Sequence, residues 1–490
     1  MVFSSPRFLL FLVVTLVTLA ILSGREAKKR FLALASCFFY ASWDWRYLGL
    51  LLTISVIDYY AALRIVATND GRSKKRWVWF SIISNLGVLA YFKYFNFFVD
   101  NANTVLSVAG LKLPYLTILL PAGISFYTFK TMSYTIDVYR GELTPCRSWL
   151  DYATFITFFP ELIAGPIVRA SVFLPQLNRP IGLSISRLLE GGGSFLVGLF
   201  KKMVIADRMA LVVDPIFKYP EVYSGATIWC ALLAYAIQIY CDFSGYSDMA
   251  IGVARMIGYD LPENFNMPYA AVNLSDFWRR WHITLSSWLR DYLYIPLGGS
   301  RCGSLLTYRN LALTMLLGGL WHGASWNFVL WGGMHGVGLA VHRLWQRNSS
   351  PRFNLPVWLG WLITLFFVTL TWVPFRALNF HDTLVCYSKL FGLFPDVGVL
   401  FLPFWLPVCL SIILTCHLFG HLCRRDETIP LWFGQSLTRL GLRVHRNSLS
   451  GSYLVLDRLT MGSGYLITMI VLLVFLFGAT NTNPFIYFQF

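Results

Sequence analysis

Long uncharged stretches of apolar residues restrict what this chain can fold into. Residues 8–22, 77–90 and 465–477 carry no charged side chain, and each run approaches the ~20 residues with which a helix crosses a bilayer. Only 13% of the residues are charged, against about 25% in an ordinary soluble domain. Because unsatisfied backbone groups are costly in hydrocarbon, these runs predict helices and not strands. We expect one all-α, multi-pass membrane domain over residues 1–490, with about ten to twelve transmembrane helices.

The positive charges predict the orientation of the chain in the membrane. The net charge is +16, but the basic residues form short clusters between apolar runs, so we expect contact with membrane lipid and no nucleic-acid binding. Basic clusters at residues 25–30 and 72–76 predict cytoplasmic loops and an amino terminus outside. Residues 31–43 and 47–63 are then expected to form a helical hairpin that turns at residues 44–46.

No soluble catalytic domain is apparent in the sequence. The polar stretch at residues 424–458 is only loop-sized. Any chemistry must therefore come from groups within or at the edges of the membrane, where ionisable side chains are costly and are functional candidates by default. Three segments carry ionisable side chains of this kind.

The first candidate segment, residues 240–250, places two carboxylates among hydroxyls in an apolar run. Asp242 and Asp248 are six residues apart, which puts them on opposite sides of a helix and argues against a paired acid and base. Gly245 is expected to allow a break in the helix. We favour a structural role for this segment, and lining of a substrate cavity remains open.

The second candidate segment, residues 276–301, is crowded with tryptophan, arginine and tyrosine. Such a composition is typical of the membrane interface, so the segment should lie at the surface or enter as a re-entrant piece. The alternative is that its arginines bind the phosphates of an anionic cofactor arriving from the cytoplasm, because guanidinium suits bidentate phosphate recognition.

The third candidate segment carries His322 near the start of an apolar run that is rich in glycine. A lone histidine is more often a core residue than a catalyst, but in hydrocarbon its imidazole needs a partner and can take a proton from a nucleophile. Glycines 318, 319 and 323 should let another backbone or a substrate approach closely. His335 and His342 are expected to be more peripheral.

A further cluster has residue types that bind metals, namely Cys416, His417, His421 and Cys423. Its two histidines are four residues apart, but its cysteine spacing is not that of a structural zinc site. We expect packing at a helix end and no metal site.

Four stretches carry a resemblance to a known family. They read FWRRWHITLSSWLRDYLYIPLGG at residues 277–299, NLALTMLLGGLWHG at 310–323, FSGYSDMAIG at 243–252 and LIAGP at 162–166. These stretches are long and specific, and the likeness extends from the first residues to beyond residue 375. The sequence resembles the membrane-bound O-acyltransferases, and within them the bacterial polysaccharide O-acetyltransferase branch that contains the alginate O-acetylation membrane subunit.

This resemblance implies a ring of helices with re-entrant segments and a central tunnel. It implies that His322 is the catalytic base and that His282 is the second family position. It further implies an acetyltransferase of the bacterial inner membrane that uses acetyl-coenzyme A as donor substrate and holds no permanently bound cofactor. A periplasmic acetyltransferase of the SGNH type would be the partner, and an exopolysaccharide such as alginate or cellulose the final acceptor. The residues expected to serve the donor are Arg279, Arg280, Trp281 and Arg290.

The carboxyl-terminal residues 485–490 read FIYFQF and follow the last apolar run. The basic loop before that run predicts a periplasmic carboxyl terminus, and an aromatic tail there is typical of an interfacial belt. The tail also resembles the terminal motif of the small partner protein in teichoic acid D-alanylation. By that likeness it is an acyl-relay motif in which Tyr487 carries the acyl group. A phenol with pKa ~10 needs a base to become a nucleophile, and a histidine in a tunnel could act as that base.

Two rival functions remain. One is D-alanyl transfer to teichoic acid, which would replace coenzyme A with a carrier protein. The other is a non-catalytic transporter of the acyl donor, although the paired interrupted segments that transporters often show are not evident in the sequence. The sequence does not identify the polysaccharide.

Overall fold

The chain folds into two compact units. The computed structural model describes residues 1–348, 355–393, 398–425, 442–447, 451–456 and 461–478. Unit 1 comprises Met1–Gly192 and Ala250–Pro262, and unit 2 comprises Gly193–Met249 and Glu263–Phe490. Two of the three boundaries fall inside helices α10 (Ile185–Phe200) and α12 (Gly225–Ile257), and the third falls between Pro262 and Glu263. That residues 1–490 form a single domain stays a prediction.

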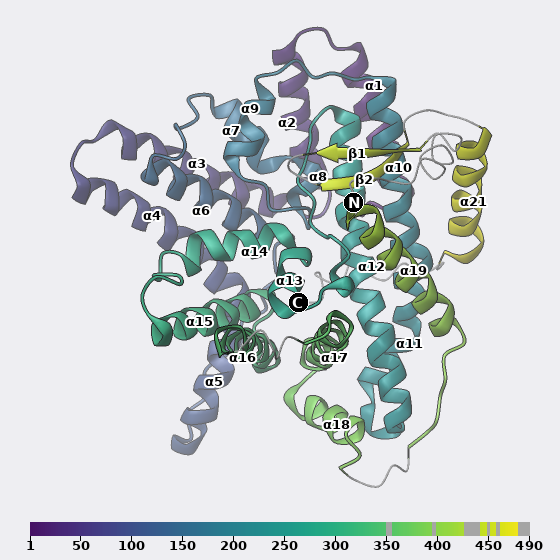
Figure 1. The fold of residues 1–490 in the computed structure, drawn as a ribbon. Helices are drawn as coiled ribbons and strands as arrows, with labels where there is room; N and C mark the ends of the chain where they lie inside the picture. Colours follow the sequence, from purple (N-terminus) through teal and green to yellow (C-terminus); the bar gives the residue numbers. More distant parts are fainter. Residues whose placement is uncertain (349–354, 394–397, 426–441, 448–450, 457–460, 479–490) are drawn as a thin grey trace. The chain divides into compact units, whose positions relative to one another are not determined.

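Unit 1 is helical and contains the predicted hairpin. The helices that precede α10 are α1 Pro6–Ile21, α2 Arg25–Ala41, α3 Trp45–Ala67, α4 Gly71–Leu89, α5 Phe95–Leu106, α6 Ile124–Arg140, α7 Trp149–Thr157, α8 Phe159–Leu162 and α9 Ala170–Leu177. Helices α2 and α3 form the hairpin predicted from the sequence, and its turn is capped by Asp44, whose carboxylate accepts a 3.0 Å hydrogen bond from the Arg46 backbone N–H. Figure 1 shows α3 and α4 side by side.

A buried polar network joins three helices of unit 1. The carboxylate of Asp58 on α3 accepts hydrogen bonds from Ser81 and Asn85 on α4, at 2.5 and 2.8 Å. The Asn85 side-chain oxygen in turn accepts one from Thr131 on α6 at 2.8 Å. Because a buried carboxylate without partners is costly, this network specifies how the three helices pack.

Unit 2 is also helical, apart from one hairpin of strands. After α12 its helices are α13 Leu274–Arg280, α14 Ile283–Leu289, α15 Ser304–His322, α16 Trp326–Asn348, α17 Val357–Arg376, α18 Phe380–Leu390, α19 Trp405–Arg425 and α21 Met461–Phe477. Helix α11 (Asp207–Lys218) follows a π-helical segment, Lys201–Ala206. Strands β1 (Leu442–Asn447) and β2 (Gly451–Leu456) pair antiparallel. The all-α prediction is confirmed, with this hairpin added in a stretch expected to be a loop.

Membrane-spanning length is met by four helical stretches among the described residues. These are Trp45–Ala67, Gly71–Ala109, Gly225–Ile257 and Val357–Arg376, and Pro6–Ile21 and Trp405–His417 are shorter apolar helices. The protein is therefore a multi-pass membrane protein. Helices α1 and α2 have only 16 and 17 residues, and α16 carries polar side chains, so these three helices are not among the four. The larger count stays a prediction.

Glycines bring α15 and α16 into close contact. A Cβ atom added at Gly319 would lie 2.2 Å from the Phe328 carbonyl oxygen, and one added at Gly332 would lie 2.3 Å from the Met315 carbonyl oxygen. Just beyond α15, a Cβ at Gly323 would lie 2.1 Å from the Phe328 ring. Figure 1 shows the two helices side by side. The close approach of another backbone, predicted from glycines 318, 319 and 323, is confirmed at Gly319, and Gly332 supplies the matching surface. At Gly318 and Gly323 the neighbours are the side chains of Leu289 and Phe328.

We predict that Gly319→Ala lowers the thermal midpoint of the detergent-purified protein, because its methyl group has no room and overpacking costs about 1–3 kcal/mol. The matched control is Gly87→Ala on α4, where a Cβ meets no atom within 4 Å. Alanine there should leave the midpoint unchanged or raise it, since alanine is the better helix former. Equal midpoints for the two variants would contradict this account of the α15 and α16 contact.

Candidate active site

His322, the last residue of α15, lies buried among aromatic rings. Its imidazole makes edge contacts with Trp331 on α16 and Phe375 on α17, at centroid distances of 5.0 and 5.1 Å. The neighbouring Trp321 ring is also 5.0 Å away. Helix α15 ends here because Gly323 adopts extended backbone, with φ −163°. The imidazole is thus held by three helices in an environment that excludes water.

His282 joins two seven-residue helices, α13 and α14, and is fully buried. Its backbone lies in the left-handed region, with φ +42°, a conformation that histidine adopts more readily than most residues. Its Nδ1 is 3.0 Å from the side-chain oxygen of Asn264, and its ring meets the Phe243 ring edge-on at 4.7 Å. His282 lies outside the candidate spans, and burial lowers the pKa of its imidazole because the charged form would lose its hydration.

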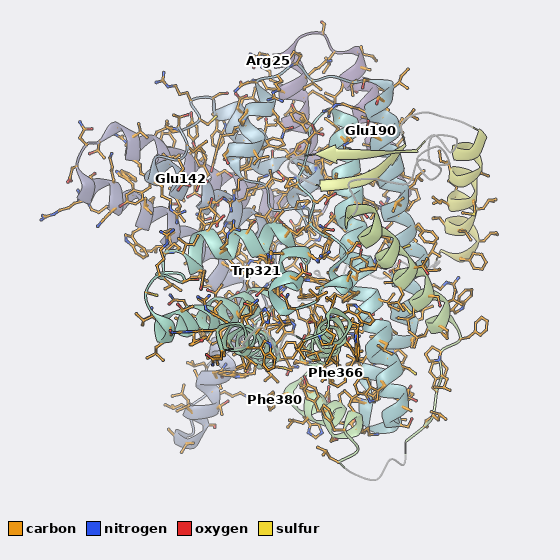
Figure 2. All side chains as sticks on the ribbon, in the orientation of Figure 1. Arg25, Glu142, Glu190, Trp321, Phe366 and Phe380 are labelled. Atoms are coloured by element: carbon orange, nitrogen blue, oxygen red, sulfur yellow. The ribbon has the colours of Figure 1, made fainter. Side chains whose placement is uncertain are left out.

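The two histidines of the site are connected through Trp321, which is labelled in Figure 2. The Trp321 ring is 6.1 Å from His282 and 5.0 Å from His322. The fold thus brings together two residues that are forty positions apart in the sequence. Their contact with one indole makes them parts of one site.

His335 belongs to the same aromatic cluster, so the expectation that it is peripheral is wrong. Its ring lies 4.8 Å from Trp331, on which His322 also packs. It is fully buried, and its Nε2 is 3.0 Å from the Thr371 hydroxyl. His335 follows Trp331 by one turn of α16 and faces the same way. The expectation failed because the sequence does not show that this face of α16 packs against His322 and α17. His342, two turns later, is half-exposed.

The residues expected to serve the donor have different surroundings. Arg280 pairs with Asp276 at 2.9 Å and Arg290 with Asp291 at 2.6 Å. Arg279 is exposed, and its Nε donates to the Ser275 carbonyl oxygen. Trp281 is buried, stacked on Phe277 and 5.0 Å from the Trp372 ring. Arg279 is therefore open to an anion, Arg280 and Arg290 are each paired with an aspartate, and Trp281 is a core residue.

The segment 240–250 lies within continuous α12, so the expected helix break at Gly245 is wrong. A Cβ at Gly245 would lie 2.7 Å from the Gly198 carbonyl oxygen, and glycine is needed for close approach of α10. The carboxylates of the segment are paired: Asp242 with Lys202 at 2.7 Å, and Asp248 with Lys201 at 2.7 Å. These pairs favour the structural role over cavity lining.

His417 on α19 packs as a core residue. Its Nδ1 donates to the Ile413 carbonyl oxygen at 2.9 Å, and its ring stacks on Tyr269 at 5.6 Å. The side chains of His421 and Cys423 lie outside the described residues, as does Tyr487. Within the described ranges, no three His, Cys, Asp or Glu side chains come together in a way that could hold a metal ion.

The sequence did not point to Asn264, Trp331 or Phe375, although the structure places all three around the histidines. Asn264 precedes His282 by 18 residues, and Trp331 and Phe375 lie on other helices than His322. No spacing rule connects these residues to the histidines. The arrangement offers two buried imidazoles walled by rings. Such a site can accept and return protons while it excludes water from an activated acyl group.

Comparisons with known proteins relate this chain to one protein family and to several named relatives. The profile of the membrane-bound O-acyltransferase family matches residues 37–380. A probable alginate O-acetylase AlgI of Pseudomonas aeruginosa is 45% identical over 80% of this chain and 75% of its own length. A peptidoglycan O-acetyltransferase of Helicobacter pylori is 42% identical over 74% of each chain. A teichoic acid D-alanyltransferase of Streptococcus thermophilus is 28% identical over 46% of this chain and 58% of its own.

The buried ion pairs near the site generate a prediction about stability. Lys202 binds both Asp207 and Asp242, at 2.8 and 2.7 Å. Lys202→Met would leave two carboxylates buried together, and we expect it to lower the free energy of unfolding by about 3–5 kcal/mol. Chemical denaturation in detergent measures this change.

The matched control is the neighbouring Lys201→Met, whose pair with Asp248 is partly exposed and should cost less. Adding Asp242→Asn to Lys202→Met should recover part of the loss, since only one unpaired carboxylate remains. Equal losses for the two lysine variants would contradict this assignment.

Proposed function

Because this chain belongs to the membrane-bound O-acyltransferase family, we propose that it moves an acetyl group from cytoplasmic acetyl-coenzyme A across the bacterial inner membrane for O-acetylation of an exopolysaccharide. The chain is an O-acyltransferase and an enzyme. The observation that carries the finer proposal is the burial of His322 within a wall of aromatic rings shared by α15, α16 and α17. A base in that setting can activate a hydroxyl while water is kept out.

In the proposed first step, the His322 imidazole takes the proton of the Tyr487 phenol. The phenolate oxygen attacks the acetyl carbonyl carbon, the bond from that carbon to sulfur breaks, and the coenzyme A thiolate leaves and receives the proton from the imidazolium. Without the base, a phenol with pKa ~10 is a poor nucleophile at neutral pH. The aryl ester that results is activated, because a phenolate leaves more readily than an alkoxide does.

His282 is proposed to orient the reacting groups. Burial lowers the pKa of its imidazole, so it is neutral at physiological pH. A neutral imidazole can form a hydrogen bond with a reacting group but carries no positive charge. Its place beside Trp321, one ring away from His322, suits that role.

The donor is proposed to bind through its phosphates. Arg279 and Arg290 are exposed on the segment that also carries His282, and guanidinium groups recognise phosphates with two parallel hydrogen bonds. Arg280 is bound to Asp276 and Arg290 to Asp291, and each would have to exchange that partner. Trp281, expected to contact the donor, is proposed instead to support the wall of the site from the core.

The acceptor side is proposed from the relatives. Two of these relatives are named as a probable alginate O-acetylase and a peptidoglycan O-acetyltransferase. We propose that a periplasmic acetyltransferase of the SGNH type takes the acetyl group from Tyr487 and delivers it to the polymer, and that both termini of this chain are periplasmic. Transfer of D-alanine remains a second candidate because of the similarity to the D-alanyltransferase of Streptococcus thermophilus.

We predict that His322→Gln lowers acetyl transfer in membranes by about 10²–10⁴-fold, the usual contribution of a general base. The control is His381→Gln on α18, where the histidine is exposed and should contribute nothing to transfer. Radiolabelled acetyl-coenzyme A and membranes of matched protein content provide the measurement. Full acetyl transfer by His322→Gln protein would refute the base. Transport of the acyl donor without acetyl transfer, unaffected by His322→Gln, would favour a transporter that forms no acyl bond.

We predict that Tyr487→Phe abolishes polymer acetylation in cells and that the carboxyl-terminal peptide of the wild type carries label from acetyl-coenzyme A. Peptide mass spectrometry reads this label directly. Tyr219→Phe, at an exposed tyrosine, is the matched control and should acetylate normally. Full acetylation by Tyr487→Phe cells would mean that His322 activates the acceptor hydroxyl directly. Label from D-alanine in place of acetyl would establish the second candidate.

A further inference from the structure

We propose that Asn264 is a positioning residue that holds His282 as the tautomer protonated at Nδ1, so that Nε2 accepts a hydrogen bond from the reacting hydroxyl and donates none. The proposal rests on the role of His282 in the proposed function. It adds a residue that the sequence did not single out and assigns a direction to the hydrogen bond that His282 makes.

The orientation of the Asn264 amide follows from its neighbours. Its Oδ1 is 3.4 Å from the Thr284 backbone nitrogen and 2.9 Å from the Thr284 hydroxyl. A backbone N–H can only donate, so the atom facing it must be the carbonyl oxygen of the amide. Its Nδ2 lies 3.2 Å from the Ser247 hydroxyl and donates to it. The opposite orientation would set an amide NH₂ against a backbone N–H.

The tautomer of His282 follows from that orientation. Nδ1 of His282 is 3.0 Å from the same Asn264 oxygen, which has no hydrogen to give. Nδ1 must therefore carry the proton and donate it. Because burial keeps the ring neutral, one nitrogen alone is protonated, and Nε2 holds the lone pair.

Asn264 also supports the backbone that presents His282. Its carbonyl oxygen accepts a 2.9 Å hydrogen bond from the Ile283 N–H, and the Asn266 N–H donates to the Arg280 carbonyl oxygen at 2.8 Å. These bonds lie on either side of His282 and hold it in its left-handed conformation. The Phe243 ring, at 90° to the imidazole, limits rotation of the ring. Backbone, ring plane and tautomer are thus set together.

This assignment restricts the chemistry of His282. A lone pair at Nε2 can accept a hydrogen bond from the Tyr487 hydroxyl, or from an acceptor hydroxyl if the relay is bypassed. It cannot stabilise the oxyanion that forms on the acetyl carbonyl, because that requires a donor. The oxyanion must be stabilised by other groups, and His282 and His322 both act on the hydroxyl side of the reaction.

The first test is nitrogen-15 NMR of the whole protein in lipid bilayers with labelled histidine. The His282 signals are those absent from His282→Gln protein. We expect a protonated Nδ1 and a bare Nε2 at neutral pH in the wild type. Asn264→Leu should lose this pattern, whereas Asn264→Asp, which keeps an acceptor oxygen, should retain it. A protonated Nε2 in the wild type, or an unchanged pattern in Asn264→Leu, would overturn the proposal.

The matched control for packing is Asn310→Leu. Asn310 is another fully buried asparagine of unit 2, and it bonds to the Leu297 and Gly299 carbonyl oxygens and not to a histidine. Its substitution should leave the His282 signals in place. Loss of the signals in both leucine variants would show a general effect on the fold and would count against a specific link between Asn264 and His282.

The second test is a double-mutant cycle on acetyl transfer. We expect Asn264→Leu to lower kcat by about ten- to a hundredfold, as loss of an orienting partner usually does, with little change in the KM for the donor. Combined with His282→Gln, it should lower the rate no further, because both act through one imidazole. Additive losses would overturn the proposal. Full transfer by His282→Gln would refute the role of His282 in the proposed function, while the NMR pattern still decides the link to Asn264.

Discussion

The approach of α15 to α16 is the contact on which the candidate site depends. Gly319 and Gly332 let the two backbones come so close that a methyl group on either glycine would meet a carbonyl oxygen. His322 is the last residue of α15, and Trp331, which packs against it, belongs to α16. Helices held further apart by ordinary side chains would leave the imidazole without its wall. The geometry of the base is therefore a consequence of backbone packing, which in lipid depends on small residues because lipid tails are as apolar as leucine.

Buried ionisable side chains have polar partners away from the site and aromatic neighbours at His322. Lys202 forms ion pairs with both Asp207 and Asp242, and the amide of Asn85 donates a hydrogen bond to Asp58. Around His322 lie the aromatic rings of Trp321, Trp331 and Phe375. The attraction within a buried ion pair at best offsets the cost of removing both charges from water, but a complete pair specifies how the helices pack. Transfer of an acyl group to a hydroxyl requires a base, and an imidazole has the chemistry to act as one.

Much of the fold follows from apolar runs and basic clusters. The hairpin of α2 and α3, the helical class and the importance of the glycines beside His322 were all predictable, because each is a local consequence of hydrophobicity or residue size. The break at Gly245 and the peripheral place of His335 were wrong. Glycine permits a break or a close contact equally well, and only the presence of α10 against α12 decides between them.

The sequence by itself determined that this is a multi-pass helical membrane protein of the O-acyltransferase family and that His282 and His322 are its strongest candidates. Motifs and composition are sufficient for these conclusions, because they depend only on which residues occur and in what order. Only the tertiary structure decided that both histidines contact Trp321, that His335 packs on the same Trp331, and that Asn264 faces the Nδ1 of His282. The contacts of His282 with Asn264 and with Trp321 join residues far apart in the chain, and the meeting of His322 and His335 on one Trp331 depends on how α15 packs on α16. Hydrogen-bond direction depends on which atoms meet after the helices have packed.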